Sequence, residues 1–513
     1  MEIELKLLVP PENLARVAAH PAVAALHAGD AHEQSLLSVY YDTPGRDLAR
    51  AGVALRVRRT AAGWVQTVKG KGGSAAGLHQ RAEHEWPLPD ERPDPALADG
   101  TPLAELFASL AVRERLAPVF ATEFVRTARP IAWPDGASAE LALDRGEVRA
   151  GDRAEAISEV ELELRAGEPA RLFELAGAVL KDVPLRVGFR SKAERGYALA
   201  GIGRRAPQKQ RPVGLDAGMT AAAALQRIAL ACLAQMQANE EGFLATGGPG
   251  RHDPEYLHQL RVGLRRLRSC LSLVRKLVPP ERLGDRAGEL RWLGQALNPA
   301  RDWDVFMTES LPPIARRFAA MTGLPALRRR GARLRRMHSA RAREAVASPR
   351  YTALVLALGA ALARDDLSPM ADGVPELAMP VAEFARSVLE KRHRKLRRRA
   401  AGIEHATPEE RHAVRIAAKR LRYAAEFFAP LFPARRAKRY IGALEEIQDI
   451  LGAVNDAATT ERLLAEAAGA GRAPIEPQLL GVVRGWLAAG AERELARFGA
   501  AWEDFADRKK FWK

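Results

Sequence analysis

The sequence predicts two domains of different class: an α+β or all-β domain over residues 1–203, and an all-helical domain over residues 217–505. Three observations lead to this prediction. The chain of 513 residues is too long for one ordinary domain of roughly 100–200 residues. Apolar and polar residues alternate in several stretches before residue 203, whereas helical spacing prevails after residue 216. The balance of charge changes between the same two positions.

The chain carries a net charge of +16, but the excess lies in its second part. Residues 1–203 contain 25 basic and 29 acidic residues, whereas residues 204–513 contain 54 and 34. The segment between the domains, residues 204–216, is rich in proline and basic residues and has no periodicity, so we expect a linker there. Such a basic chain indicates a polyanionic partner, such as nucleic acid, a phosphate polymer or an anionic membrane.

The composition excludes several classes of protein. Hydrophobic residues make up 47% of the chain, which is enough to form cores and excludes a disordered chain. The two cysteines, Cys232 and Cys270, exclude a disulfide framework and fit a reducing cytosol. The first ten residues lack the layout of a signal peptide, and no run of about 18 apolar residues predicts a membrane span. We therefore expect a cytoplasmic protein.

Four stretches of the first domain carry charged residues along one strand face, because residues two apart share a face. These residues are Glu2, Glu4 and Lys6, then Arg56 and Arg58, then Arg81, Glu83 and Glu85, and finally Glu159, Glu161 and Glu163. One interpretation is an ordinary solvated sheet face. Another is a barrel whose inner face encloses a polar ligand. In that case acidic strands would suit Mg²⁺ or Mn²⁺, and basic strands would suit phosphate oxygens.

The opening motif Glu2-x-Glu4-x-Lys6 resembles the signature of the CYTH superfamily, the triphosphate tunnel metalloenzymes. Further motifs follow in the family's order: YYDTP at 40–44, Arg56 and Arg58, Lys69 in TVKG, Arg81-x-Glu83-x-Glu85, Arg126, Asp144-Arg-Gly146 as a D-x-G turn, Glu159-x-Glu161-x-Glu163, and Ser191-Lys192. The resemblance covers residues 1–203 and implies an antiparallel eight-stranded tunnel, open at both ends. Known members act on inorganic triphosphate, thiamine triphosphate, RNA 5′-triphosphate ends, or ATP in adenylyl cyclisation.

The resemblance also implies a role for each matching residue. Metal, Mg²⁺ or Mn²⁺, would be bound among Glu2, Glu4, Asp144, Glu159, Glu161 and Glu163. Phosphates would be held by Lys6, Arg56, Arg58, Lys69, Arg81, Arg126 and Lys192. The implied catalytic set is Glu2, Glu4, Lys6, Lys69, Glu83 and Glu85. The chemistry would be positioning and charge neutralisation in phosphoryl transfer, with a metal-oriented water as the nucleophile.

The helical half contains an internal repeat with a constant offset of 154 residues. The sequence HQLRVGLRRLR at 258–268 matches HAVRIAAKRLR at 412–422, and the match continues downstream to Asp302 and Asp456. The sequence therefore predicts two similar helical units, at about residues 217–365 and 380–505, with a two-fold-like arrangement of their main helices.

Each copy of the repeat has an apolar face and a basic stripe at helical spacing. The basic sets are His258, Arg261, Arg265, Arg266 and Arg268 in the first copy, and His412, Arg415, Lys419, Arg420 and Arg422 in the second. Such residues can simply solvate a surface helix, but two stripes brought together would form a cationic groove. The histidines either cap and pack helices or donate to phosphate, more strongly at lower pH because the ordinary pKa of histidine is about 6.5.

This half resembles a CHAD domain, a conserved-histidine α-helical domain, over residues 217–505. The duplicated H-x-x-R-x-x-x-[KR]-R-L-R motif carries the resemblance, together with the RDWDV and NDA segments. It implies two four-helix bundles with pseudo-two-fold symmetry and a basic surface that binds inorganic polyphosphate.

The leading functional prediction is metal-dependent hydrolysis of inorganic triphosphate, or of a related triphosphate, beside a helical domain that binds polyphosphate and associates with polyphosphate granules. The alternatives are an adenylyl cyclase or thiamine triphosphatase built on the same tunnel, a tunnel that binds without turnover, and a nucleic-acid-binding protein. Only 6% of the residues are aromatic, and the basic stripes lack interleaved aromatics for base stacking, which disfavours nucleic acid.

Overall fold

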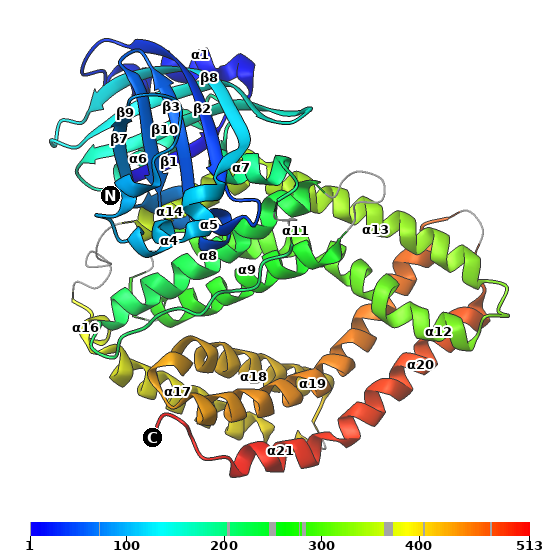
Figure 1. Ribbon diagram of the computed structural model, residues 1–513. Helices are drawn as coiled ribbons and strands as arrows, with labels where there is room; N and C mark the ends of the chain where they lie inside the picture. The colour runs from blue at the N-terminus through cyan, green and yellow to red at the C-terminus, as the bar shows by residue number, and fades with distance from the viewer. Residues whose placement is uncertain are drawn as a thin grey trace. The chain divides into compact units, whose positions relative to one another are not determined.

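A computed structural model describes residues 2–70, 72–202, 206–245, 253–275, 277–279, 284–363, 373–403, 406–471 and 474–513. The chain forms two compact units, drawn in Figure 1. The first is Met1–Pro207 with Ala347–Asp365, and the second is Gln208–Val346 with Asp366–Lys513. The predicted linker, where it is described at residues 206–216, contains no helix or strand.

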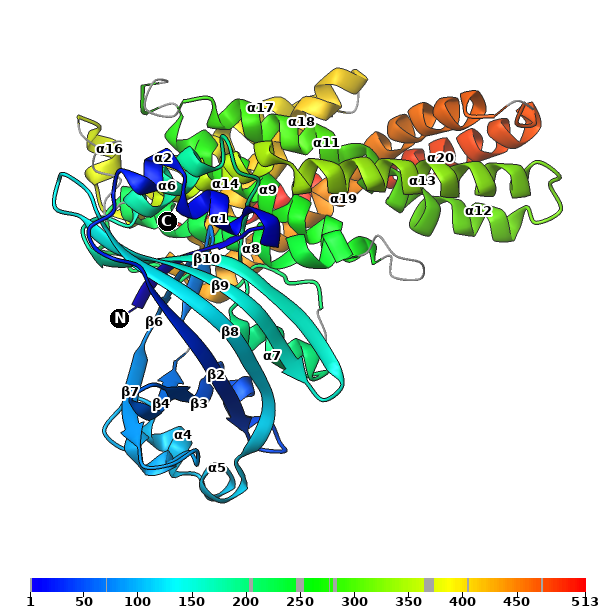
Figure 2. The same cartoon turned by 90° about the horizontal axis from the view of Figure 1, so that it is seen from above.

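One antiparallel sheet dominates the first unit. Eleven strands of the described chain belong to it, in the order β5-β6-β1-β10-β9-β8-β2-β3-β4-β7, with β11 paired to β1. The strands are β1 (Glu2–Leu8), β2 (His32–Asp42), β3 (Ala54–Thr60), β4 (Gly63–Lys69), β5 (Gly73–Ala75), β6 (Leu78–Arg81), β7 (Glu83–Leu88), β8 (Ala117–Ala132), β9 (Ser138–Ala150), β10 (Arg153–Ala166) and β11 (Arg186–Val187). The sheet curls strongly (Figure 2), which confirms the predicted antiparallel tunnel class. The resemblance implied eight strands, and the very short β5, β6 and β11 enlarge the sheet around β1.

Alternation along the strands separates a charged inner face from an apolar outer face. Leu5 and Leu7 of β1 are buried in the core, while Glu4 and Lys6, which alternate with them, face the inside of the curled sheet. Two further apolar clusters lie around Phe124 and Phe107. The unit also contains α1 (Leu14–Ala18), α2 (Pro21–Ala24), α3 (Asp47–Ala51), α4 (Ala104–Ala108), α5 (Leu110–Arg115), α6 (Ala170–Val179) and α7 (Lys192–Leu199).

The predicted D-x-G turn at residues 144–146 is wrong, because these residues lie inside β9 and pair with both β8 and β10. Gly146 has a different reason to be glycine. A Cβ placed there would stand 2.1 Å from the carbonyl oxygen of Glu123 and 2.4 Å from the Cα of Phe124. The glycine thus allows β8 and β9 to approach closely, next to the residues that face the cavity.

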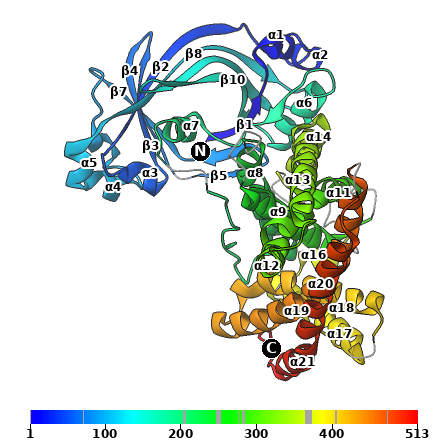
Figure 3. The same ribbon diagram turned by 90° about the vertical axis from the view of Figure 1, so that its right-hand side faces the viewer.

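Helix α14 (Pro349–Leu362) belongs to the first unit, although its residues lie far along the helical half of the sequence. It contacts α6 and β11, and Figure 3 shows α6 and α14 side by side. A Cβ on Gly359 would stand 2.3 Å from the ring of Phe173, so the two helices pack at short distance. The first unit therefore extends beyond residues 1–203.

The second unit is helical. Its helices are α8 (Ala221–Ala245), α9 (Pro254–Val274), α11 (Arg286–Val305), α12 (Leu311–Arg317), α13 (Leu324–Ala347), α16 (Pro375–Ala378), α17 (Val381–Ala400), α18 (Pro408–Phe428), α19 (Ala434–Gly469), α20 (Pro477–Ala496) and α21 (Phe498–Asp507). Helices α9 and α18 begin one repeat offset apart, at Pro254 and Pro408, as the duplication predicts. In the described part of the chain no single helix has the length and hydropathy of a membrane span; only the bent pair α13 and α14 reaches them.

The second unit has two cores, and each contains helices from both copies of the repeat. Helices α8 and α9 of the first copy contact α17 and α18 of the second. The other core joins the end of α11, α12 and α13 to α19 and α20, around Trp303, Leu334 and Leu464 (Figure 1). The predicted duplicated four-helix bundles are therefore confirmed, and each bundle takes its helices from both copies.

Candidate active site and cation cluster

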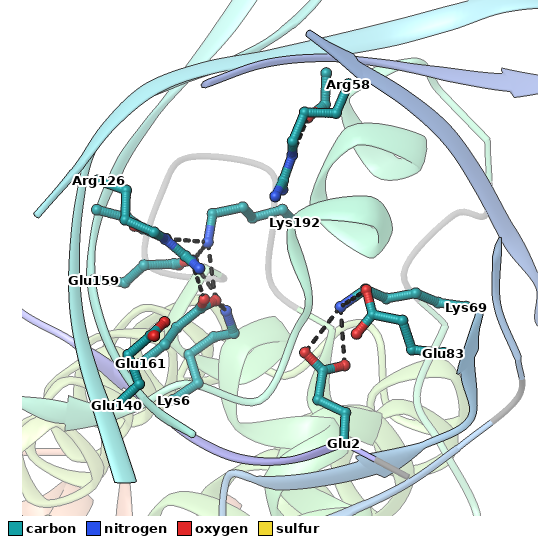
Figure 4. Close-up of polar contacts among 12 residues, drawn as sticks. Glu2, Lys6, Arg58, Lys69, Glu83, Arg126, Glu140, Glu159, Glu161 and Lys192 are labelled. Atoms are coloured by element: carbon teal, nitrogen blue, oxygen red, sulfur yellow. Dashed lines mark hydrogen bonds and ion pairs between the residues drawn. The ribbon is translucent and has the colours of Figure 1, made fainter. Parts of the chain in front are cut away.

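A cavity of about 660 Å³ lies within the curled sheet of the first unit and is lined mainly by ionisable side chains. Most of the residues selected from the sequence line it: Glu2, Glu4, Lys6, Arg56, Arg58, Lys69, Arg81, Glu83, Glu85, Arg126, Glu161, Glu163 and Lys192. Figure 4 shows many of these side chains converging from separate strands. Asp144 and Glu159 do not line the cavity, since both are fully buried behind it.

The strand register places three carboxylates side by side. Glu4 of β1 is opposite Glu163 of β10, and Glu163 is opposite Glu140 of β9. We call Glu4, Glu140 and Glu163 the acidic row. Arg165 pairs with two members of the row, since its guanidinium is 2.6 Å from Glu163 and 3.3 Å from Glu140. With three carboxylates beside this guanidinium, the row holds an excess of negative charge. Like charges directly opposite one another on a sheet repel and are unfavourable.

The pKa values of the acidic row reflect that excess. Burial, together with Glu2, Glu140 and Glu4, raises the pKa of Glu163 to about 7, although Arg165 opposes the shift. Burial and the nearby Glu161 likewise raise the pKa of Glu4 above its usual value. A cation bound among these carboxylates would relieve the repulsion.

A second group of carboxylates, the buried acidic cluster, consists of Asp144, Glu159 and Glu161. One oxygen from each lies within 4.8 Å of the others, as a metal site would require. Cations of the chain already contact this cluster. Lys6 Nζ is 3.0 Å from Glu159, and Lys192 Nζ is 2.6 Å from Asp144.

These contacts favour the ionised form of Glu161 in the buried acidic cluster. Arg126 donates two hydrogen bonds of 2.7 Å to Asp144 and also pairs with Glu161. Burial opposes ionisation of Glu161, but Lys192, Lys6 and Arg126 outweigh it and hold its pKa well below the usual value. The cluster therefore orients three cations toward the cavity.

Arg58 supplies positive charge to the cavity, and among the described residues no carboxylate forms an ion pair with it. Its Nε donates a hydrogen bond of 3.0 Å to the hydroxyl of Ser38. Burial and the neighbouring Arg56 and Arg126 lower the pKa of Arg58 to about 9. A bound polyanion would relieve the repulsion among these guanidinium groups and could accept hydrogen bonds from them.

Two other cations of the cavity, Arg56 and Lys69, are paired with acidic residues. Arg56 lies 3.5 Å from Glu83 and 3.6 Å from Glu85, and Lys69 lies 2.9 Å from Glu2. Arg81, which the sequence also predicts to hold phosphate, contacts His79 Nδ1 at 2.8 Å.

Sequence reasoning missed several cavity residues, including Glu140, Arg165 and Tyr40. Alternation could have identified Glu140, since it is four residues before Asp144 on the same strand. Tyr40 lies opposite Arg56 in the sheet, and although burial opposes its ionisation, Arg56 and Arg58 lower its pKa. Arg195 was also missed; it donates to Glu159 from α7 at 3.2 Å.

In the second unit, cations of α9 and α18 lie close together. We call Arg261, Arg265, Arg415, Lys419 and Arg422 the α9–α18 cluster. Arg265 donates to the hydroxyl of Tyr423 on α18 at 3.2 Å, which ties the two copies of the repeat together. Burial, followed by Arg415, Arg265, Arg422 and Arg261, lowers the pKa of Lys419 to about 7.

Other residues of the predicted basic stripes have different surroundings from those of this cluster. Arg266 pairs with Glu426 and stacks on the rings of Tyr423 and Phe427, so it has a packing role. Arg268 lies against α11, where Arg291 contributes to lowering its pKa. Arg420 and His412 are exposed. Burial and Arg301 lower the pKa of His258 to about 4, so this imidazole is neutral at pH 7 and lacks the charge of a phosphate-binding cation.

The sequence matches the CYTH domain family over residues 1–197 and the CHAD domain family over residues 227–465. It is 33% identical over 201 residues to an inorganic triphosphatase of Haemophilus influenzae, which is 39% of this chain and 54% of that protein. The chain thus spans about half the length of this relative. The crystal structure of a CHAD domain from the plant Ricinus communis is similar, with 34% identity and a TM-score of 0.50 over 59% of this chain and 98% of that one. The chain therefore consists of a CYTH domain followed by a CHAD domain.

Proposed function

We propose that the first unit hydrolyses inorganic triphosphate, or a related triphosphate, with the help of Mg²⁺ or Mn²⁺. The supporting observation is that one cavity presents both an excess of carboxylate, in the acidic row, and an excess of guanidinium, at Arg58. A metal-bound triphosphate carries both signs of charge, so it complements both regions at once. The similarity to the Haemophilus inorganic triphosphatase supports the same activity.

The acidic row fits the metal better than the buried acidic cluster does. Carboxylate oxygens are the donors that Mg²⁺ and Mn²⁺ prefer. Within the acidic row one guanidinium, that of Arg165, pairs with Glu140 and Glu163, whereas Asp144, Glu159 and Glu161 are each contacted by at least one lysine. When bound, the metal would neutralise phosphate charge and lower the pKa of a water molecule.

The side chains of the chain supply binding and orientation. Arg58 and Arg126 hold phosphate oxygens, while Asp144 fixes the plane of the Arg126 guanidinium through its two hydrogen bonds. Lys6 and Lys192 keep their charge because the buried carboxylates raise their pKa values despite burial. Glu83 and Glu85 orient Arg56, and Glu2 orients Lys69. These contacts place positive charge where the phosphate chain would lie.

A phosphate-release assay tests this function. The full chain would be given inorganic triphosphate, pyrophosphate, ATP, thiamine triphosphate or long polyphosphate, each with Mg²⁺, Mn²⁺ or a chelator. We expect release from triphosphate that needs the metal, and an about 100-fold loss in Glu4→Gln. The matched control is Glu123→Gln, which changes an exposed carboxylate of β8. Full metal-dependent turnover by Glu4→Gln would contradict the metal assignment, and preferential cyclisation of ATP would replace the proposed reaction.

For the second unit we propose binding of inorganic polyphosphate at the α9–α18 cluster. The support is that five cations come together from two helices while Arg266 and Arg420 face elsewhere. Binding to a repeating phosphate chain would weaken steeply with salt, by analogy with nucleic acids. Competition of polyphosphate against DNA and RNA at matched salt, with Arg415→Ala and Arg420→Ala compared, checks the ligand and the face. Stronger binding of nucleic acid would overturn the proposal.

The proposed location is the cytoplasm, in association with polyphosphate granules. The support is the polyphosphate binding proposed for the α9–α18 cluster. Fluorescently tagged full-length chain should co-localise with granules, and the double variant Arg261→Ala/Arg415→Ala should lose this while retaining phosphate release. Unchanged co-localisation of the variant would contradict the granule assignment.

A further inference from the structure

Lys419 is the one amine in the α9–α18 cluster, and its neighbours there are all guanidinium groups. Arg415 and Arg422 lie four residues before it and three after it, on the same face of α18. Arg265 reaches this face from α9, where it donates to Tyr423. Among the described residues no carboxylate pairs with Lys419, although it is partly exposed and therefore accessible to small solutes.

The arginines and the lysine respond differently to mutual repulsion. A guanidinium keeps its proton in proteins, whereas an ammonium gives it up readily when it is partly buried beside other cations. The nearby acids face the arginines: Asp456 acts on Arg415, and Asp302 acts on Arg261. Burial and this repulsion lower the pKa of Lys419 to about 7, which favours the neutral amine at neutral pH far more than in an ordinary lysine. A neutral amine is a nucleophile.

We propose that Lys419 is a covalent acylation site for small acyl phosphates, whose phosphate group is held by the surrounding arginines. The arginines supply the anion recognition, and the amine beside them supplies the attacking lone pair. This proposal does not depend on the activity proposed for the cavity of the first unit.

The reaction balances without another reagent. The lone pair of Nζ attacks the carbonyl carbon of the acyl phosphate, and an N–C bond forms. The bond between that carbon and the bridging phosphate oxygen breaks, and inorganic phosphate leaves with the electron pair. The proton lost by Nζ goes to the departing phosphate. The product is an uncharged amide, so acylation removes one positive charge from the α9–α18 cluster.

Lys438 of α19 is a matched comparison within the same chain. It is exposed, and Arg435, Arg436 and Arg439 surround it in sequence. Both lysines therefore lie among arginines, but only Lys419 is held against cations of a second helix. Relative to an ordinary lysine, whose pKa is about 10.4, a pKa near 7 raises the fraction of neutral amine at pH 7.5 by nearly three orders of magnitude. A weaker base is also a weaker nucleophile, so we expect a net advantage of about tenfold.

The experiment treats the full chain with acetyl phosphate at pH 7.5 and follows each lysine by peptide mass spectrometry. We expect Lys419 to be acetylated about tenfold faster than Lys438. Equal or slower modification of Lys419 would overturn the proposal. A neutral acetylating ester, which lacks the phosphate, should give a smaller preference for Lys419. The same preference with both reagents would overturn the role of the arginines in binding the phosphate.

Two variants complete the test. Arg265→Gln and Arg415→Gln should each slow acetylation of Lys419 by about threefold or more and leave Lys438 unchanged, with circular dichroism showing that each variant is folded. An unchanged Lys419 rate in both folded variants would contradict the proposal. Finally, the wild-type chain treated with acetyl phosphate should bind polyphosphate as weakly as untreated Lys419→Gln does. The same treatment should leave polyphosphate binding by Lys419→Arg unchanged.

Discussion

Glu163 lies between two other carboxylates, Glu4 on one neighbouring strand and Glu140 on the other. Its ionisation is therefore unfavourable in the folded chain, where burial and these neighbours raise its pKa to about 7. The same arrangement destabilises the fold at this point and would favour binding of the proposed divalent cation.

The pH dependence of stability follows from this shift. The folded chain keeps a proton on Glu163 that the unfolded chain releases from about pH 4.5, so stability falls as pH rises from 4.5 to 7. Glu163→Gln removes the charge. We expect it to raise the melting temperature at pH 8 in the presence of a chelator, and to leave it unchanged at pH 4.5. Thermal unfolding at both pH values checks this, and an equal gain at both would show that another effect dominates.

A second prediction at this scale concerns Arg58. Its guanidinium lines the cavity and forms no ion pair with a carboxylate in the described part of the chain, whereas its neighbour Arg59 is exposed. Because Arg58 is proposed to bind phosphate, Arg58→Ala should lower kcat/KM for triphosphate by about 100-fold. Steady-state kinetics of Arg58→Ala and Arg59→Ala check this side by side. Similar losses in the two variants would indicate a general effect on the strand.

Individual residues also show what the sequence could reveal. Alternation correctly grouped Glu2, Glu4 and Lys6 on one face, because a strand forces residues two apart to the same side. It could not show that Lys6 contacts Glu159 and Glu161, since strand pairing between β1 and β10 joins residues about 150 positions apart. For the same reason it could not separate the acidic row from the buried acidic cluster. That distinction depends on which neighbours each carboxylate meets.

At the scale of elements, strand β9 depends on Gly146. The resemblance of Asp144-Arg-Gly146 to a D-x-G turn predicted a turn here, but tertiary contact with β8 decides the conformation. A methyl group at this position would overlap the backbone of β8, which no flexible side chain can relieve.

We expect Gly146→Ala to destabilise the chain by about 3 kcal/mol, since the added carbon meets backbone atoms. Gly177→Ala is the control, because Gly177 lies inside α6 with no atom within 4 Å of an added Cβ. That substitution should be neutral or stabilising, as alanine is the better helix former. Urea unfolding of both variants provides the measurement. A Gly146→Ala chain as stable as the wild type would contradict the close approach of the strands.

On the scale of the whole molecule, the repeat predicted two helical units but not how they combine. The copies share their cores: α8 and α9 meet α17 and α18, and Trp303 of the first copy donates to Glu466 of the second at 3.0 Å. Sequence similarity reveals duplication, but an interface between copies looks like any other apolar helix face. The extension of the first unit by α14 was likewise hidden, because an apolar helix does not indicate its partner.

The extension predicts how shortened chains behave. Residues 1–207 alone would expose the surface of α6 around Phe173, whereas the same segment joined by a flexible linker to residues 347–365 would cover it. We expect the joined chain to melt at a higher temperature and to aggregate less. The joined chain with Gly359→Leu is the control, since the larger side chain would clash with Phe173. Identical melting of all three chains would show that α14 does not stabilise the first unit.

Helix α14 also has a consequence for how the protein is made. Because residues 347–365 complete the first unit, synthesis must pass through the first copy of the helical repeat before that unit has all its parts. Domains generally fold as units while the chain grows. Here the nascent first unit has to wait, with one apolar surface uncovered, until more than a hundred further residues have left the ribosome. Completion of the first unit therefore depends on synthesis of part of the helical half of the chain.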